Sequence, residues 1–207
     1  MEQGSSYLSM RTHFAVTVAL LAPFSFSQLL RADPIENAVK EIRATYNTIE
    51  EADLSGKTLK WEPHNDPFRG RITQYFFEGN LVKVHLSFGD GAHGGSDEYY
   101  YYSNGELFFA FVVGGYWKFS GRAKADGQAE TVDICSEDRL YFKEGRLIRH
   151  LYKRAQSTDP ALIKSIMAAT ENAHHDDPEF ADQVQRRAIL AVSASSPGDI
   201  EKIIYSE

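Results

Sequence analysis

The sequence is poor in cysteine and lacks the common catalytic motifs. Its single cysteine, Cys135, cannot form an internal disulfide, so the fold must be held together by a hydrophobic core. No phosphate-binding loop, dinucleotide-binding fingerprint or H-E-x-x-H motif is present, and Gly94-Gly95-Ser96 does not form a G-x-S-x-G nucleophile elbow. The sequence therefore predicts no cofactor and no recognisable class of enzyme.

Positive charge is also scarce. The chain carries 22 Lys and Arg residues against 29 Asp and Glu residues, which gives a formal net charge of −7. Phosphate groups and anionic lipids repel such a chain, which argues against nucleic acid and against a charged membrane surface as partners. A protein or a glycan is the expected partner.

The N-terminus has the pattern of a secretory signal peptide. Arg11 and His13 precede the apolar run of residues 14–26, FAVTVALLAPFSF. This run is too short to span a bilayer, which takes about 20 residues, but it suits the hydrophobic region of a signal peptide. We expect residues 1–27 to be removed by cleavage near Ser27 or Ala32, with translation starting at Met1 or Met10.

These features predict a secreted or periplasmic bacterial protein. Cys135 lies far from the apolar run, so a lipid anchor is not expected. After cleavage the chain should not insert stably into a membrane, and export without disulfides favours a bacterial envelope. Residues 33–207 are predicted to form one α+β domain.

One short phrase occurs three times: two aromatic residues, a spacer, Glu-Gly or Asn-Gly, one residue and Leu. The copies are residues 75–81, 101–107 and 141–147. Aromatic residues favour strands, and Glu-Gly or Asn-Gly supplies the positive φ that a two-residue hairpin turn requires. The phrase resembles, in its turn chemistry, the hairpin repeats of bacterial cell-wall-binding and MORN-type proteins. The copies are unequally spaced, which excludes a propeller or solenoid.

The region before these hairpins predicts a helix over residues 34–51. Asp33, Pro34 and Glu36 have the residue types of an N-cap and a first helical turn. Apolar residues then recur at spacings of three and four, which predicts one apolar face. They are Ile35, Val39, Ile42, Tyr46 and Ile49.

Residues 57–153 read as strands joined by short turns, which is typical of an antiparallel meander. Residues 57–62 are a candidate first strand, and the strands expected after it are 71–77, 81–88, 97–103, 106–113, 115–120, 129–135, 138–143 and 146–153, with turns at Gly114 and at Ser136-Glu137. Two helices follow within residues 160–205, beginning at Asp159-Pro160 and Asp177-Pro178. The predicted fold is an N-terminal amphipathic helix packed on a curved meander of roughly six to eight strands, followed by two C-terminal helices. It is similar to the arrangement of cystatin-like exported proteins.

The aromatic residues of the central hairpin are the candidate ligand-binding residues. They are Tyr99, Tyr100, Tyr101, Tyr102, Tyr116 and Trp117. Alternation predicts that Tyr100, Tyr102, Leu107 and Phe109 point to one face of the sheet, and Tyr99, Tyr101, Phe108 and Ala110 to the other. Tyr and Trp suit recognition of a sugar or a protein, although the same rings could instead pack across strands within the sheet.

The loop 89–98 offers metal-ligating residue types. Asp90, His93 and Asp97 could share one cation, or the four glycines of the loop could simply form a mobile connection. His174-His175-Asp176-Asp177 fits either a metal site or a helix end followed by an N-cap. Cys135 with His85, His93 or His150 is a further catalytic candidate, against a role as a small packed residue.

We expect an exported, non-catalytic binding or accessory protein. The partner would be a protein or a glycan bound on the aromatic sheet face. The alternatives are a small periplasmic hydrolase with a site near His85, Asp90 and His93, and an enzyme inhibitor that presents the loop 89–98.

Overall fold

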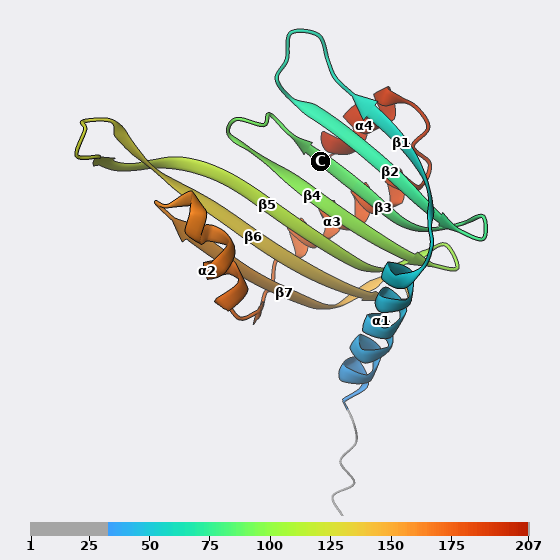
Figure 1. The fold of residues 1–207 in the computed structure, drawn as a ribbon. Coiled ribbons are helices and arrows are strands. Elements are labelled where there is room, and N and C mark those ends of the chain that lie inside the picture. The colour runs from blue at the N-terminus through green and yellow to red at the C-terminus, as the bar shows by residue number, and fades with distance from the viewer. Residues whose placement is uncertain (1–32, 207) are drawn as a thin grey trace, which may run out of the picture. The chain divides into compact units, whose positions relative to one another are not determined.

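A computed structural model describes residues 33–206, which contain one antiparallel sheet and four α-helices (Figure 1). The eight strands are hydrogen-bonded in the order in which they occur along the chain, so the predicted antiparallel meander is confirmed. The strands are β1 (Ser55–Trp61), β2 (Arg69–Phe77), β3 (Asn80–Gly89), β4 (Gly94–Ser103), β5 (Glu106–Ala123), β6 (Ala129–Lys143), β7 (Arg146–Ser157) and β8 (Ala173–His174). The helices are α1 (Pro34–Glu51), the 3-10 turn η1 (Pro160–Leu162), α2 (Ile163–Ala169), α3 (Pro178–Val192) and α4 (Pro197–Ile204).

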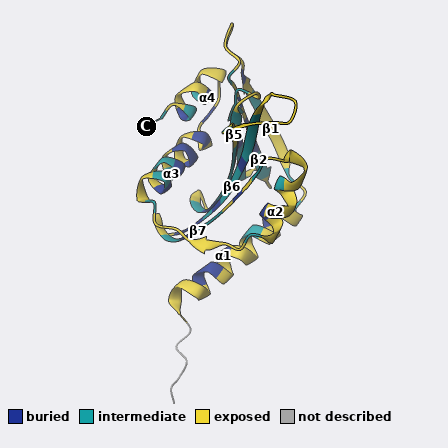
Figure 2. Cartoon of the chain, turned by 90° about the vertical axis from the view of Figure 1, so that its left-hand side faces the viewer, coloured by how far each residue is buried: buried dark blue, intermediate teal, exposed yellow. Residues whose placement is uncertain are grey.

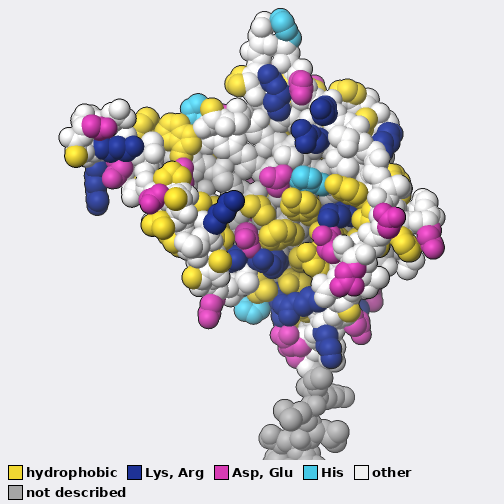
Figure 3. All heavy atoms as spheres, viewed as in Figure 1, with side chains coloured by type: hydrophobic (Ala, Val, Ile, Leu, Met, Phe, Trp, Pro, Cys, Tyr) yellow, Lys and Arg dark blue, Asp and Glu magenta, His cyan; other side chains and the backbone are white. Residues whose placement is uncertain are grey.

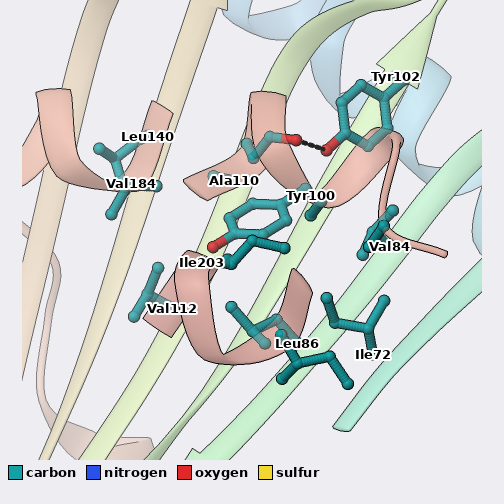
Figure 4. Packing of buried hydrophobic residues seen from close by; sticks show 14 of the residues in the cluster. Ile72, Val84, Leu86, Tyr100, Tyr102, Ala110, Val112, Leu140, Val184 and Ile203 are labelled. Atoms are coloured by element: carbon teal, nitrogen blue, oxygen red, sulfur yellow. Dashed lines mark hydrogen bonds between the residues drawn. The ribbon is translucent and has the colours of Figure 1, made fainter. Parts of the chain in front are cut away.

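The helices α3 and α4 cover one face of the sheet, which we call the covered face (Figure 2). Alternate residues of β2 to β6 point toward these helices and are almost completely buried. Figure 4 shows Tyr100 and Tyr102 directed from the sheet into this core, near Val184 of α3 and Ile203 of α4. Burying this much apolar surface is the main force that holds the two helices to the sheet.

Polar contacts fix the position of α3 on this face. The side-chain amide of Gln74 donates to the carbonyl oxygens of Ala191, Val192 and Ala194, each at 3.1 Å, and thereby satisfies carbonyls at the end of the helix. The Tyr102 hydroxyl donates to the Ala188 carbonyl at 2.7 Å. A buried Gln and a buried Tyr are tolerated here because their polar atoms have partners.

Local sequence explains where α3 and α4 begin. Asp177 is the N-cap of α3, and its carboxylate accepts a hydrogen bond from the Phe180 backbone at 3.0 Å. Ser196 and Asp199 form a capping box at the start of α4. A proline follows each cap, where its fixed φ and missing N–H are tolerated.

The opposite face of the sheet, which we call the open face, carries α1 and α2. Val39, Ile42 and Ile49 of α1 are buried in one cluster with Tyr101, Phe109 and Tyr141 of the sheet. Near the helix ends, Glu50 pairs with Lys83 at 2.6 Å and Glu36 pairs with Arg149 at 2.5 Å. At the other side of this face, Lys153 of β7 donates to the Met167 carbonyl of α2 at 3.0 Å.

The three repeated phrases form three hairpins with the same turn. Glu78-Gly79, Asn104-Gly105 and Glu144-Gly145 all have positive φ, from 48° to 81°, which is the signature of a type I′ turn. In each hairpin the strand pairing shifts immediately after the Leu, and one residue of the returning strand is left over as a β-bulge. The bulged residues are Val82, Phe108 and Ile148, and all three pack into the cluster beneath α1.

These bulges correct the predicted orientation of the central hairpin. Strict alternation placed Phe109 with Tyr100 and Tyr102, and Ala110 with Tyr101. Because Phe108 is an extra residue, Phe109 lies opposite Tyr101 and joins the cluster under α1, whereas Ala110 joins the covered core. One inserted residue therefore reversed the side of the sheet on which each of these two residues lies.

Two predicted turns are absent from the described residues. β5 continues through Gly114, and β6 continues through Ser136 and Glu137, so each is one long strand where the sequence predicted two. The pairs Gly114↔Ser136 and Val113↔Glu137 keep the two strands in register. A glycine or a polar pair is compatible with a strand when its neighbours supply the hydrogen bonds.

None of the helices within residues 33–206 is both long and apolar enough to cross a bilayer. The predicted signal peptide and its cleavage positions, Ser27 and Ala32, lie outside the described residues.

Candidate functional site

Four planar side chains lie side by side on the open face, one from each of four adjacent strands. His85, Tyr99, Phe111 and Arg139 are successive register partners in β3, β4, β5 and β6, and we call them the planar strip. The rings of His85 and Tyr99 are stacked 4.3 Å apart, and Tyr99 and Phe111 follow at 6.1 Å. The Arg139 guanidinium lies 4.8 Å from the Phe111 ring centre, within cation–π range.

A hollow of about 590 Å³ lies beside the planar strip, farther from α1. Its floor includes Gly89, Gly95 and Gly115, which are register partners across β3, β4 and β5. We call it the glycine hollow. Figure 3 views this face: yellow side chains cross its middle, next to a white stretch of backbone and small residues, with dark blue Lys and Arg side chains over β1 and β2.

Two kinds of glycine make the floor. A Cβ atom on Gly95 would lie 2.7 Å from the Phe88 carbonyl oxygen, so a larger residue there would displace backbone. A Cβ atom on Gly115 would meet only the Ile134 carbonyl oxygen, at 3.7 Å, which is ordinary van der Waals contact. Neighbouring atoms would therefore allow a larger residue at position 115, and the absence of a side chain on Gly115 leaves space on the open face.

The charged side chains around the hollow differ in whether they form ion pairs. Asp97 accepts a hydrogen bond from the His85 ring at 2.7 Å, and burial together with the nearby Asp97 raises the pKa of Tyr99. In the row of cross-strand partners that contains Asp97, Glu137 pairs with Arg139 at 2.8 Å and with Lys153 at 3.2 Å. Lys60 and Arg71, in contrast, are direct register partners in β1 and β2, and neither forms an ion pair within residues 33–206.

Three of the predicted ligand-binding tyrosines are core residues. Tyr100 and Tyr102 are buried under α3 and α4, and Tyr101 is buried under α1, with exposed fractions of 0%, 3% and 2%. Only Tyr99 lies half-buried on the open face. The four consecutive tyrosines therefore point alternately to the two faces of the sheet, and their burial differs because different helices cover the two faces at different places.

The other two predicted aromatic residues lie on the extension of β5. Tyr116 is exposed, and its hydroxyl accepts a long 3.5 Å hydrogen bond from Arg154. The Trp117 indole N–H donates to the Ala92 carbonyl, and its ring stacks on His93 at 5.2 Å. Trp117 thus fastens the β3–β4 loop to β5.

The proposed metal ligands are not gathered at one point. Asp90 accepts hydrogen bonds from the backbone N–H groups of Ala92, His93 and Gly94 and pairs with the His93 ring at 2.9 Å. These bonds, that from His93 above all, lower the pKa of Asp90 to about 2. Asp97 pairs instead with His85, and residues 33–206 contain no group of three His, Cys, Asp or Glu side chains suited to a metal ion.

The cysteine and histidine candidates are dispersed. Burial, with the nearby Glu137, raises the pKa of Cys135, which disfavours the thiolate form needed for catalysis. His150 is buried and pairs with Asp138 at 2.7 Å in the adjacent strand. His175 approaches Asp177 at 3.9 Å, and Asp177 caps α3. The pair that remains on the open face is His85 with Asp97.

Sequence reasoning missed Phe111, Arg139 and the glycine floor. The signal for the floor was present as Gly89, Gly94–Gly95 and Gly114–Gly115, but these glycines come from three strands that only the register brings together. No protein-family model, curated protein or solved structure shows significant similarity to the chain.

Proposed function

We propose that the chain is an exported, non-catalytic binding protein whose ligand occupies the open face of the sheet, along the planar strip and over the glycine hollow. The proposal includes α1 as a fixed wall of this face, because its buried residues and its ion pairs with Lys83 and Arg149 tie it to the sheet. The ligand would lie between this wall and the far end of the hollow.

The observation that carries the proposal is the difference between the two faces. The covered face is filled by α3 and α4, whereas Tyr99, Phe111 and Val113 on the open face are only half-buried. A concave space of about 590 Å³ lies within the range of small-molecule sites, about 300–1,000 Å³. An uncovered aromatic row next to such a space is typical of a binding surface.

An NMR titration of the ¹⁵N-labelled full chain with a fragment set of neutral sugars, amines, acids and alcohols tests the proposal. We expect saturable shifts of the Gly95, Gly114 and Gly115 amides. Gly115→Val should weaken them because it fills the hollow, and Tyr99→Ala should weaken them because it removes part of the planar strip beside the hollow. Phe119→Ala, an exposed change on the β5 extension, is the matched control. Shifts that cluster elsewhere, or that both site variants leave unchanged, would refute the proposal.

His85 and Asp97 support a second candidate, a hydrolase of the open face. Their 2.7 Å hydrogen bond would orient the imidazole as a general base. Hydrolysis of aryl esters that His85→Gln and Asp97→Asn both abolish, with the chain still folded, would favour this candidate over simple binding. The inhibitor alternative has less support, because only Asp90–His93 lie outside β3 and β4 and Trp117 holds this loop.

Export is part of the proposal and has its own test. The full chain is expressed in a bacterium, and the intact mass of the protein in the periplasmic fraction is measured. A mass that corresponds to cleavage after Ser27 or Ala32 is expected. Recovery of only uncleaved chain, inside the cell, would contradict export while leaving the binding proposal untouched.

A further inference from the structure

Two positive charges face each other at one end of the glycine hollow. Lys60 and Arg71 are cross-strand register partners, and both line the hollow. Thr58 and Thr73, the preceding register pair on the same side of these strands, share a hydrogen bond at 3.0 Å, so side chains of opposed residues on this side of β1 and β2 can reach one another. Like charges directly opposite on a sheet are destabilising, so this pair costs stability unless something else compensates it.

The acidic residues at the hollow do not compensate the pair. Asp97 is engaged by His85, and Asp90 is engaged by the backbone of its own loop and by His93. Glu62 also lines the hollow but makes no ion pair with Lys60 or Arg71. The third cation, Arg69, donates to the carbonyl oxygens of Asp66 and Phe68.

We propose that the ligand of the open face is a small organic anion, whose carboxylate or phosphoryl oxygens meet Lys60 and Arg71 while its planar body lies on the glycine floor. This inference rests on the proposed function and names its ligand class. Ammonium and guanidinium groups are the donors that carboxylates and phosphates take, and a guanidinium can bind either in bidentate fashion.

The shape of the site favours a compact, flat ligand. Gly89, Gly95 and Gly115 present backbone without side chains, so a planar group can approach closely. The faces of His85 and Tyr99 are occupied by each other at 4.3 Å, so the strip offers ring edges and a hydroxyl rather than a free stacking platform. An extended sugar chain needs such a platform, and a small aryl or conjugated acid does not.

The charge at the Lys60 and Arg71 end of the hollow is positive, whereas the net charge of the whole chain is negative. A net charge of −7 repels anions at long range, but screening at physiological salt limits this repulsion to about 8 Å. Within the hollow, a bound anion would see Lys60 and Arg71 first. The cost of holding these two cations together is explained if an anion separates them.

Benzoate, phenyl phosphate and the neutral isostere benzamide are titrated into the full chain, and chemical shifts of the floor amides are followed. We expect benzoate or phenyl phosphate to bind more tightly than benzamide. The double variant Lys60→Gln/Arg71→Gln should weaken anion binding by about tenfold or more without lowering the thermal midpoint of the free protein. Arg122→Gln/Lys124→Gln, which removes the same charge from the exposed end of β5 and the residue that follows it, should leave anion affinity unchanged.

The outcomes separate the two proposals. Floor shifts that are as strong with benzamide, or that survive the Lys60/Arg71 variant, overturn the anion inference and leave the binding site in place. No floor shifts with any fragment overturn both. Tighter binding of phenyl phosphate than of benzoate identifies a phosphoryl ligand, and the reverse order identifies a carboxylate.

Discussion

At the scale of single residues, the most consequential interaction in the covered core is ionic. Arg187 of α3 makes a bidentate pair with Glu98 of β4, with N–O distances of 2.9 and 2.8 Å, and the Tyr100 hydroxyl donates to the same carboxylate. Although burial by itself lowers the pKa of Arg187, the Glu98 carboxylate more than offsets this and raises it. Arg187 thus stays charged inside the core, and its two hydrogen bonds to Glu98 tie α3 to the middle of the sheet.

Breaking this pair should be far more harmful than replacing it. Glu98→Ala leaves the buried Arg187 without its partner, so we expect the free energy of unfolding to fall by about 3–5 kcal/mol. The double variant Glu98→Leu/Arg187→Met removes both charges and should recover most of that loss. Urea denaturation of the single and double variants measures both; a double variant as unstable as Glu98→Ala would contradict the prediction.

The Asp90 carboxylate stabilises the loop at the hollow, and this stabilisation depends on pH. Its pKa is lowered to about 2 from an ordinary value of 3.8, so the stabilisation is complete above pH 4 and is lost as the pH falls through 2. Hydrogen exchange should show protected amides at Ala92, His93 and Gly94 above pH 4, with protection decreasing toward pH 2. Asp90→Ala should remove this protection at every pH, and protection that persists in that variant would argue against the role.

At the scale of elements, the repeated phrase specified the hairpins well. The type I′ turns occur at the three predicted Glu-Gly and Asn-Gly positions, because few other dipeptides accept two successive positive φ values. The bulges were not predictable, since nothing in the phrase marks Val82, Phe108 or Ile148 as extra residues. The long course of β5 and β6 was missed for a related reason: a glycine inside a strand and a glycine in a turn look alike in sequence.

The different roles of two glycines can be measured. Gly105 has φ near +80° in a turn, so Gly105→Ala should lower the free energy of unfolding by about 1–2 kcal/mol. Gly115→Ala, in a strand with open space around it, should change it by less than about 0.5 kcal/mol. Equal losses in thermal or urea unfolding would contradict this distinction.

At the scale of the whole sheet, the two faces differ in how completely helices cover them. Leu140 is fully buried in the covered core, whereas Leu151, its near neighbour in β7, is half-buried on the open face. Leu140→Ala should cost about 2–5 kcal/mol, and Leu151→Ala clearly less. Urea unfolding of the two variants tests this, and a larger loss for Leu151 would mean that the open face is occupied in the free protein.

The candidate site could be predicted only in part, because the sequence does not show which parts of each face of the sheet the helices cover. Tyr99, Asp97 and His85 were identified from their residue types, but their chemistry depends on which strand lies beside which. Tyr100, Tyr101 and Tyr102 looked equally suitable, and only the helices packed on either side distinguish them from Tyr99. When helices cover part of both faces of a sheet, the alternation of residues along a strand does not predict which residues are buried.

The length of β5 and β6 has a mechanical consequence. β4 ends its pairing with β5 at Tyr116, and Trp117 still contacts the β3–β4 loop, so residues 118–123 and 129–132 form a two-stranded ribbon that lacks the support of a neighbouring strand on the β4 side. With Phe119 exposed on it, this ribbon should open before the remainder of the sheet. Limited proteolysis is therefore expected to nick residues 124–128 first, giving two fragments that stay associated and elute together under native conditions.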